Sequence, residues 1–236
     1  MPVQVYLIKK FMSRSNNTDN KLNFEEMFFT MKFDQLREYI ELALKYSKQA
    51  SEEINQGILN WDSKNLDPQF SGHDVYEDDF LSLCNFEDTI VTSTIILINS
   101  ELETSLKFIC NEYYKNVNRK INPKNIKGDN NLDNYKLYLE KIMDIDLSEI
   151  NWKLLFSYNL LRNKIVHQNS KIILNEGEKL FSNKEYIKLK IINDVSISNS
   201  GAITLRNRNP LDEFIKLCLE LLITIFEKQK NNETIH

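Results

Sequence analysis

Residues 80–117, FLSLCNFEDTIVTSTIILINSELETSLKFICNEYYKNV, decide the fold class. Their apolar residues recur every three or four positions, which is the spacing of one face of a helix. The centre, 89–98, is rich in β-branched residues that taken alone would favour a strand. The sustained period and the absence of Gly and Pro instead predict one long helix with an irregularity. The residues that set the period are Phe86, Ile90, Leu97, Leu102, Leu106, Ile109 and Tyr113.

The composition of the whole chain also favours helices. The chain has 236 residues and a net charge of -4, and 42% of the residues are hydrophobic, so it can bury a sizeable core. It contains only 5 Gly and 4 Pro, which is too few for the many sharp turns of a sandwich or barrel. The glycines are isolated from one another, which excludes a GxGxxG dinucleotide fingerprint and a P-loop.

Further helices are predicted on both sides of this segment. An Asn-x-x-Glu capping box at 23–26 begins a helix that ends near residue 57. A shorter helix covers 132–142, and an Asp-x-x-Glu box at 146–149 opens a helix whose apolar face continues to Ile165. The chain therefore contains several amphipathic helices that can pack against the long one.

The chain after Asn169 is expected to form strands first and a helix last. Apolar alternation at 186–192 and 202–205, on either side of a Ser-Asn-Ser-Gly turn, predicts a β-hairpin over about 186–205. Asn209 then caps a last helix, with Pro210 at its first position.

These elements predict a mainly α fold. It is an antiparallel up-and-down bundle of four to five helices with a small β-hairpin insertion. We expect a single helical domain over 23–230, preceded by an N-terminal arm or short strand over 1–22.

The cysteines and histidines argue against a metal or redox centre. Cys84, Cys110 and Cys218 lie far apart in apolar helical patterns, so buried thiols in a reducing compartment are expected. There is no CxxC, the histidines are scattered, and no apolar run is long enough to span a bilayer. We therefore expect a cytoplasmic protein with no cofactor, no metal and no membrane partner.

The string LLRNKIVH, residues 160–167, is the candidate catalytic motif. Arg162 and His167 are five positions apart, so their side chains point about 140° apart around the helix, and both can reach a groove at its end. An imidazole can exchange protons near neutral pH, and a guanidinium can hold a phosphate as its charge develops. With Asn163 to orient either group, the trio suits metal-independent RNA cleavage. Ile165 and Val166 are expected to anchor this turn in the core.

A structural alternative stays open for the same residues. Arg162 could pair with a surface carboxylate, and His167 could stabilise the helix C-terminus, where a cation is favourable.

The wider string WKLLFSYNLLRNKIVH, residues 152–167, resembles the signature helix of the HEPN superfamily, whose pattern is Arg, a polar residue, a spacer and His. The stretch at 99–109 is similar to the long preceding helix of such proteins, which often carries a glutamate. The resemblance covers roughly residues 80 to 225. It implies a helical bundle and a homodimer in which two motifs form a composite active site.

The resemblance also implies an activity. In catalytic members the Arg and His cleave RNA, so it implies roles for Arg162 and His167, with Asn163 as the polar partner. Many members are toxins of toxin–antitoxin or phage-defence systems, which implies a possible antitoxin or defence partner. One subfamily, paired with nucleotidyltransferase antitoxins, has a tyrosine where this chain has Asn169, which speaks against that pairing. The alternatives are a non-catalytic HEPN-like module that binds RNA or protein, and a structural oligomer subunit.

Two further groups of residues could support such a site. Glu101 could hold Arg162 or tune His167, although a solvated helical face also explains it. A basic stretch without acidic residues between 115 and 128 could hold an RNA backbone by charge. The tentative RNA-binding residues are Arg119, Lys120, Lys124 and Lys127, together with Lys164 in the motif.

Overall fold

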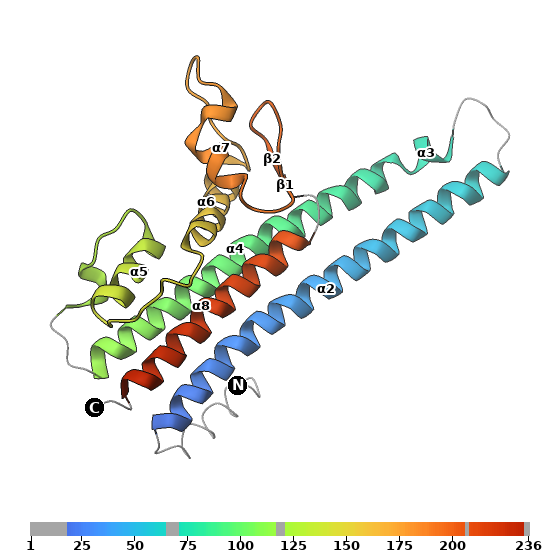
Figure 1. The fold of residues 1–236 in the computed structure, drawn as a ribbon. Coiled ribbons are helices and arrows are strands. Elements are labelled where there is room, and N and C mark those ends of the chain that lie inside the picture. The colour runs from blue at the N-terminus through green and yellow to red at the C-terminus, as the bar shows by residue number, and fades with distance from the viewer. Residues whose placement is uncertain (1–17, 65–70, 117–120, 206–207, 234–236) are drawn as a thin grey trace. The chain divides into compact units, whose positions relative to one another are not determined.

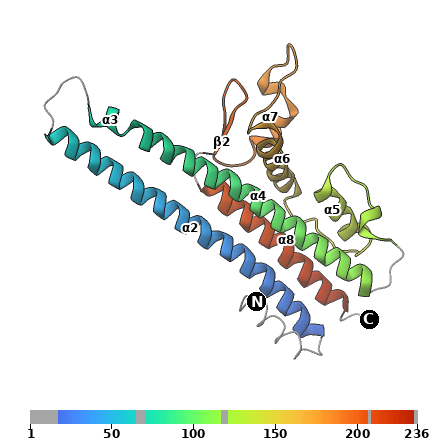
Figure 2. The same ribbon diagram turned by 180° about the vertical axis from the view of Figure 1, so that it is seen from behind.

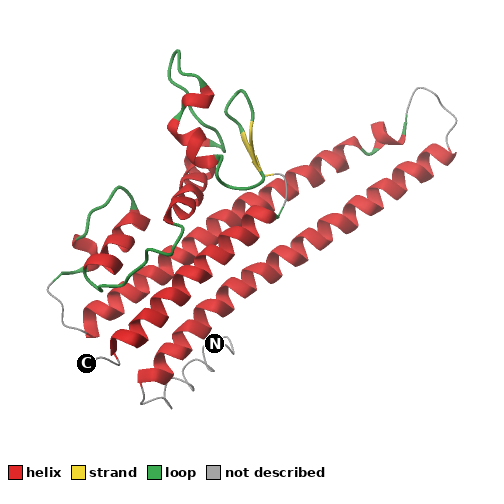
Figure 3. Ribbon diagram, viewed as in Figure 1, coloured by secondary structure: helices red, strands yellow, loops and turns green. Residues whose placement is uncertain are grey.

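The computed structural model describes residues 18–64, 71–116, 121–205 and 208–233. It is 75% helical with a two-stranded antiparallel hairpin, so the predicted mainly α fold with a small β insertion is confirmed (Figure 3). The helices are α2 (Thr18–Lys64), α3 (Gly72–Val75), α4 (Glu77–Asn116), α5 (Asn131–Lys141), α6 (Trp152–Gln168), α7 (Lys184–Leu189) and α8 (Asn209–Glu233). The short elements are the 3-10 turns η1 (Pro123–Asn125) and η2 (Leu180–Ser182) and the strands β1 (Val195–Ile197) and β2 (Ile203–Leu205).

The long helix predicted from residues 80–117 is α4, which is helical from Glu77 to Asn116 without the expected irregularity. The threonines of its β-branched centre do not oppose the helix, because each donates its hydroxyl to a backbone carbonyl one turn earlier. Thr89, Thr92 and Thr94 donate to the carbonyls four residues before them at 2.7 Å each. By length and composition alone, α4 contains an 18-residue window of mean hydropathy 1.4 that could cross a membrane. The core helix of a soluble protein passes the same test.

The chain forms two compact units. Unit 1 comprises Met1–Asp34, Asn99–Asn159 and Glu213–His236, and unit 2 comprises Gln35–Ile98 and Leu160–Asp212. Helices α2, α4, α6 and α8 each contribute residues to both units.

Aromatic rings join the helices of unit 1. Phe29 of α2 stacks on Phe226 of α8 and meets the edge of Phe108 of α4, with ring centroids 5.9 Å apart in both pairs. Tyr158 of α6 stacks on Phe214 of α8 at 4.3 Å. All but one of these rings are buried, so their burial contributes to the stability of this unit. Figures 1 and 2 show α4 and α8 side by side from opposite directions.

In unit 2, α2 and α4 form an antiparallel pair. The Ser47 hydroxyl donates to the Glu87 carboxylate, and further along α2 Gly57 faces the ring of Tyr76. The C-terminal half of α6, η2, α7 and the hairpin complete the unit. In the hairpin, Val195 pairs with Leu205 and Ile197 with Ile203.

The predicted first strand of the hairpin is wrong. Residues 184–189 form α7, and β1 begins only at Val195. Asn183 explains the difference, because its side chain accepts from the backbone N–H groups of Glu185 and Tyr186 and so caps a helix.

Two other predicted boundaries also differ. The helix predicted to open at Asp146 begins later, because the carboxylate of Asp146 accepts from the N–H of Ser148 in a turn. Helix α6 begins at Trp152, and the side chain of Asn151, just before it, accepts a hydrogen bond from the N–H of Leu154. Helix α2 begins at Thr18 and continues past the expected end to Lys64. Residues 1–17 of the N-terminal arm predicted over 1–22 lie outside the described residues, and residues 18–22 belong to α2.

Candidate functional site

The C-terminal half of α6 holds Arg162 and Asn163 together. The Arg162 Nη1 donates to the Asn163 Oδ1 at 3.0 Å, so the carboxamide fixes the orientation of the guanidinium. Arg162 Nε is buried and has no hydrogen-bond partner within the described residues. Both side chains are partly exposed, which leaves other guanidinium N–H groups able to meet an anion.

His167 lies in the last turn of the same helix. Its side chain is exposed, and within the described part of the chain it makes no hydrogen bond or ion pair. An imidazole in this position is accessible to solvent and to a polyanion. It also lies where a cation interacts favourably with the helix dipole, so the position suits a proton-transfer role and a capping role equally.

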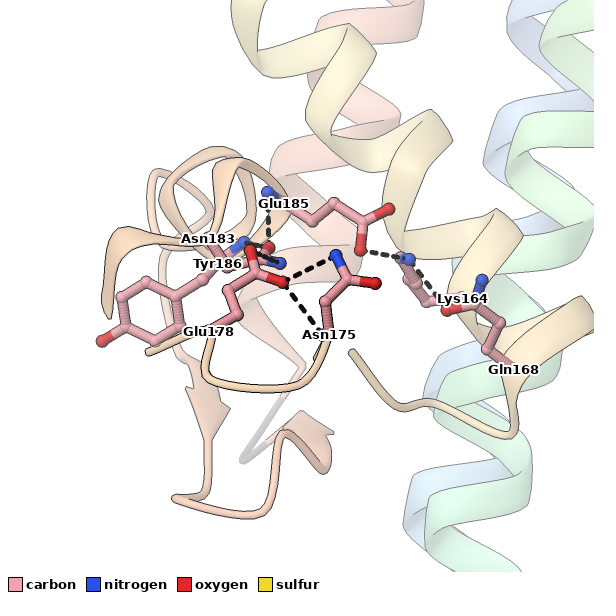
Figure 4. A network of polar contacts seen from close by, with 7 residues as sticks. All are labelled: Lys164, Gln168, Asn175, Glu178, Asn183, Glu185 and Tyr186. Carbon is pink, nitrogen blue, oxygen red and sulfur yellow. Dashed lines mark hydrogen bonds and ion pairs between the residues drawn. The ribbon is translucent and has the colours of Figure 1, made fainter. Parts of the chain in front are cut away.

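Lys164, not Val166, anchors the motif turn in the protein. Val166 is 42% exposed, whereas Lys164 is only 3% exposed, so the expectation for Val166 is wrong. The Lys164 ammonium lies 2.5 Å from Glu185 Oε2 of α7 and donates to Gln168 Oε1 at 2.8 Å (Figure 4). This burial contradicts the prediction that Lys164 contacts RNA, because its charge is already neutralised inside the fold.

A polar network continues from this ion pair into the segment before α7 (Figure 4). Asn183, which caps α7, also donates its amide to Glu178 Oε1 at 2.8 Å. The other oxygen of Glu178 accepts from the backbone N–H of Asn175 at 3.0 Å. The hydrogen bonds from Asn175 and Asn183 lower the pKa of Glu178 below its ordinary value. The network gives this loop a defined conformation beside the motif helix.

The backbone after α6 ties the hairpin to the motif. Asn169 and Ser170 have φ angles of 47° and 55°, and the Ser170 N–H donates to the Lys164 carbonyl at 3.0 Å. The Ser170 carbonyl then accepts from Ile203 N–H of β2 at 2.7 Å, and Ile172 N–H donates to the Gly201 carbonyl at 2.9 Å. The segment that follows the motif helix is therefore hydrogen-bonded to the hairpin.

A cavity of about 440 Å³ lies in unit 2 against α6. Its apolar lining comes from all three surrounding elements, and its polar lining comes mostly from one face of α4. Sequence reasoning missed this cavity, although the polar residues of α4 follow the i, i+3, i+4, i+7 spacing of a shared face. The lining residues are Asn85, Asp88, Thr89, Val91 and Thr92 of α4, Leu161 and Ile165 of α6, and Ser170, Ile203, Thr204 and Leu205.

Other candidate residues lie in unit 1. Glu101 pairs with Lys32 of α2 at 2.5 Å, which gives it a partner other than the predicted Arg162. Lys124 and Lys127 are exposed, as the prediction that they bind RNA requires. Arg119 and Lys120 fall outside the described residues.

One cysteine differs from expectation. Cys84 is exposed, whereas Cys110 and Cys218 are buried. Burial raises the pKa of the Cys110 thiol to about 12 and the pKa of Cys218 well above its ordinary value. Among the described residues, no group of three or more His, Cys, Asp and Glu side chains could hold a metal ion.

Comparison of the chain with family models, curated proteins and solved structures finds no match. The chemistry of the motif, the cavity and the network around them therefore carries the functional argument.

Proposed function

We propose that the chain is a metal-independent endoribonuclease of HEPN type that acts as the toxin of a toxin–antitoxin or phage-defence system. One observation supports the activity most: α6 carries a guanidinium oriented by Asn163 and ends with an exposed imidazole. The resemblance of residues 152–167 to the HEPN signature helix supports the biological role.

The proposed reaction needs only proton transfer and charge stabilisation. A base removes the proton of a 2′-hydroxyl, and its oxygen attacks the adjacent phosphorus. The bond to the 5′-oxygen breaks, and that oxygen takes a proton from an acid. The products are a 2′,3′-cyclic phosphate and a 5′-hydroxyl, and His167 can exchange the protons. Arg162 stabilises the negative charge that builds on the phosphate oxygens in the transition state.

This mechanism favours a composite site in a homodimer. In an in-line displacement the attacking and leaving oxygens lie on opposite sides of the phosphorus, so one imidazole cannot serve both in the same step. The side chains of Arg162 and His167 also point about 140° apart around α6. A second copy of the motif supplies the missing acid, and the two guanidinium groups hold the phosphate between them.

Single substitutions with a matched control test the proposal. His167→Ala should lower the cleavage rate of a single-stranded RNA by at least about 100-fold, and Arg162→Ala by about 100-fold or more. His73→Ala removes an exposed histidine of α3 and should cleave at the wild-type rate. Circular dichroism of each variant monitors folding. The assay contains EDTA, and the products are checked for a cyclic phosphate.

Three outcomes would contradict the proposal: wild-type cleavage by His167→Ala, loss of cleavage in EDTA, or a product without a cyclic phosphate. Expression in a bacterial host tests the biological role, since a toxin should arrest growth and His167→Ala should not. The competing function is a non-catalytic module that binds RNA or protein. It is favoured by the internal bonds of Arg162 and Lys164, and it predicts binding without cleavage.

A further inference from the structure

The cavity beside α6 has an apolar floor and a polar rim. Val91, Leu161 and Ile165 form part of the floor together with Ile203 of β2. The rim of α4 is exposed, so a ligand can enter from solvent. A volume of about 440 Å³ is within the range of small-ligand sites and is large enough for a nucleobase with its ribose.

Several polar groups of the cavity have no partner for their side chains within the described residues. The hydroxyl groups of Thr89 and Thr92 donate hydrogen bonds to backbone carbonyls. In contrast, no hydrogen bond or ion pair within that part of the chain involves the carboxylate of Asp88, the carboxamide of Asn85 or the hydroxyl of Thr204. These groups converge on one cavity, as the polar groups of a ligand site do.

The charge of the cavity restricts what it can bind. Asp88 repels a phosphate, and the described residues that line the cavity include no cation. A carboxylate instead accepts two parallel hydrogen bonds from a planar group with adjacent N–H donors. Of the four RNA bases, only guanine has two adjacent donors, N1–H and N2–H, on its Watson–Crick edge. Single-stranded RNA is commonly read through this edge.

We propose that this cavity holds a guanine base of the RNA substrate, with Asp88 accepting from N1–H and N2–H. The assignment of the RNA as ligand rests on the proposed function. Leu161 and Ile165 line the cavity, and Arg162 lies directly after Leu161 in α6. His167 is two residues beyond Ile165, about 200° around the helix. The bound guanine and the cleaved phosphate therefore belong to different nucleotides, and cleavage occurs at a fixed offset from a guanosine.

Binding to a cleavage-deficient protein tests this directly. Full-length His167→Ala is titrated with labelled RNA 10-mers that contain one guanosine, inosine or adenosine in a uridine background. Inosine lacks only the exocyclic amino group, so it should bind about ten-fold more weakly or worse, as should adenosine. Adding Asp88→Asn should abolish the preference for guanosine. Adding Asp78→Asn, on the same helix outside the cavity, should leave the preference intact.

The outcomes separate this inference from the proposed function. Equal binding of the guanosine and inosine RNAs, or an unchanged preference in a folded Asp88→Asn variant, would overturn the inference even if the wild-type protein cleaves RNA. Asp88-dependent preference without any cleavage by wild type would support the cavity assignment and remove the nuclease proposal. If free guanosine binds as tightly as the RNA, the cavity is a nucleoside site and not an RNA subsite.

Discussion

Breaking the Lys164–Glu185 pair should destabilise the protein by an amount that depends on which partner is removed. The Lys164 side chain is 4% exposed and the Glu185 side chain 37% exposed. Lys164→Met keeps most of the buried hydrocarbon and leaves a carboxylate that water can reach. Glu185→Met leaves a buried ammonium with Gln168 as its remaining partner. The second substitution should therefore cost more.

The magnitude follows from this difference in burial. Removing one partner of a fully buried pair costs roughly 3–5 kcal/mol, whereas exposed pairs contribute about 1 kcal/mol or less. We expect a loss of about 1–2 kcal/mol for Lys164→Met and about 3 kcal/mol for Glu185→Met. The double variant should cost less than the sum of the single variants, with a coupling of about 1–2 kcal/mol.

Urea unfolding of the wild type, both single variants and the double variant, followed by circular dichroism, measures all of these quantities. A coupling below about 0.3 kcal/mol, within the error of additivity, would refute the argument that the pair anchors α7 to the motif helix. So would a smaller loss for Glu185→Met than for Lys164→Met. If Lys164 instead contacted RNA, Lys164→Met would spare stability and reduce the salt dependence of RNA binding.

Three further predictions concern other parts of the fold. Gly201→Ala should lower the free energy of unfolding by about 3 kcal/mol, because Gly201 has φ +82 and an added Cβ would lie 2.6 Å from the Ile172 carbonyl oxygen. In the same urea assay Gly177→Ala, with φ +76 but nothing within 4 Å, should cost only about 1 kcal/mol, and equal losses would contradict this account. A thiol reagent at pH 8 should label the exposed Cys84 quickly. Cys110 and Cys218 should react only after denaturation, because only a thiolate reacts and burial raises the pKa of both thiols. Mass spectrometry identifies the labelled residue, and rapid labelling of Cys110 in the native protein would contradict its burial. The hydrogen bonds that lower the pKa of Glu178 stabilise the 175–183 segment while its carboxylate is ionised, so this contribution is present above the ordinary pKa of 4.5 and is lost as the pH falls through the lowered pKa of the folded state. NMR of the Asn175 amide should show the segment loosening on acidification, and a signal unchanged to pH 2 would contradict this expectation.

The sequence predicted the elements that have long regular patterns. Helix α4 follows from its apolar period, and the threonines of its centre donate their hydroxyl groups to carbonyls of the same helix. Residues 186–192 misled because they alternate like a strand, while the decisive feature is a single capping residue, Asn183, just before them. The pattern of apolar residues alone does not show that the helix cap at Asn183 outweighs the strand-like alternation after it.

The surroundings of the candidate site were beyond what pattern reading can provide. Lys164 looked like a surface cation because its partner Glu185 is far along the chain and lies on a helix that was expected to be a strand. The cavity combines residues of α4, α6 and β2 that only folding brings together. In contrast, Arg162 and Asn163 are neighbours in sequence, and their hydrogen bond is the kind of arrangement that a short motif can indicate.

The two compact units share four helices, α2, α4, α6 and α8. This sharing limits how the protein can be divided into fragments for expression. Unit 1 is assembled from three separate stretches of the chain and unit 2 from two, so no single truncation yields one unit intact. Fragment libraries and domain swaps with breakpoints inside these helices should give insoluble products, and point substitutions are the better route to assigning roles within this protein.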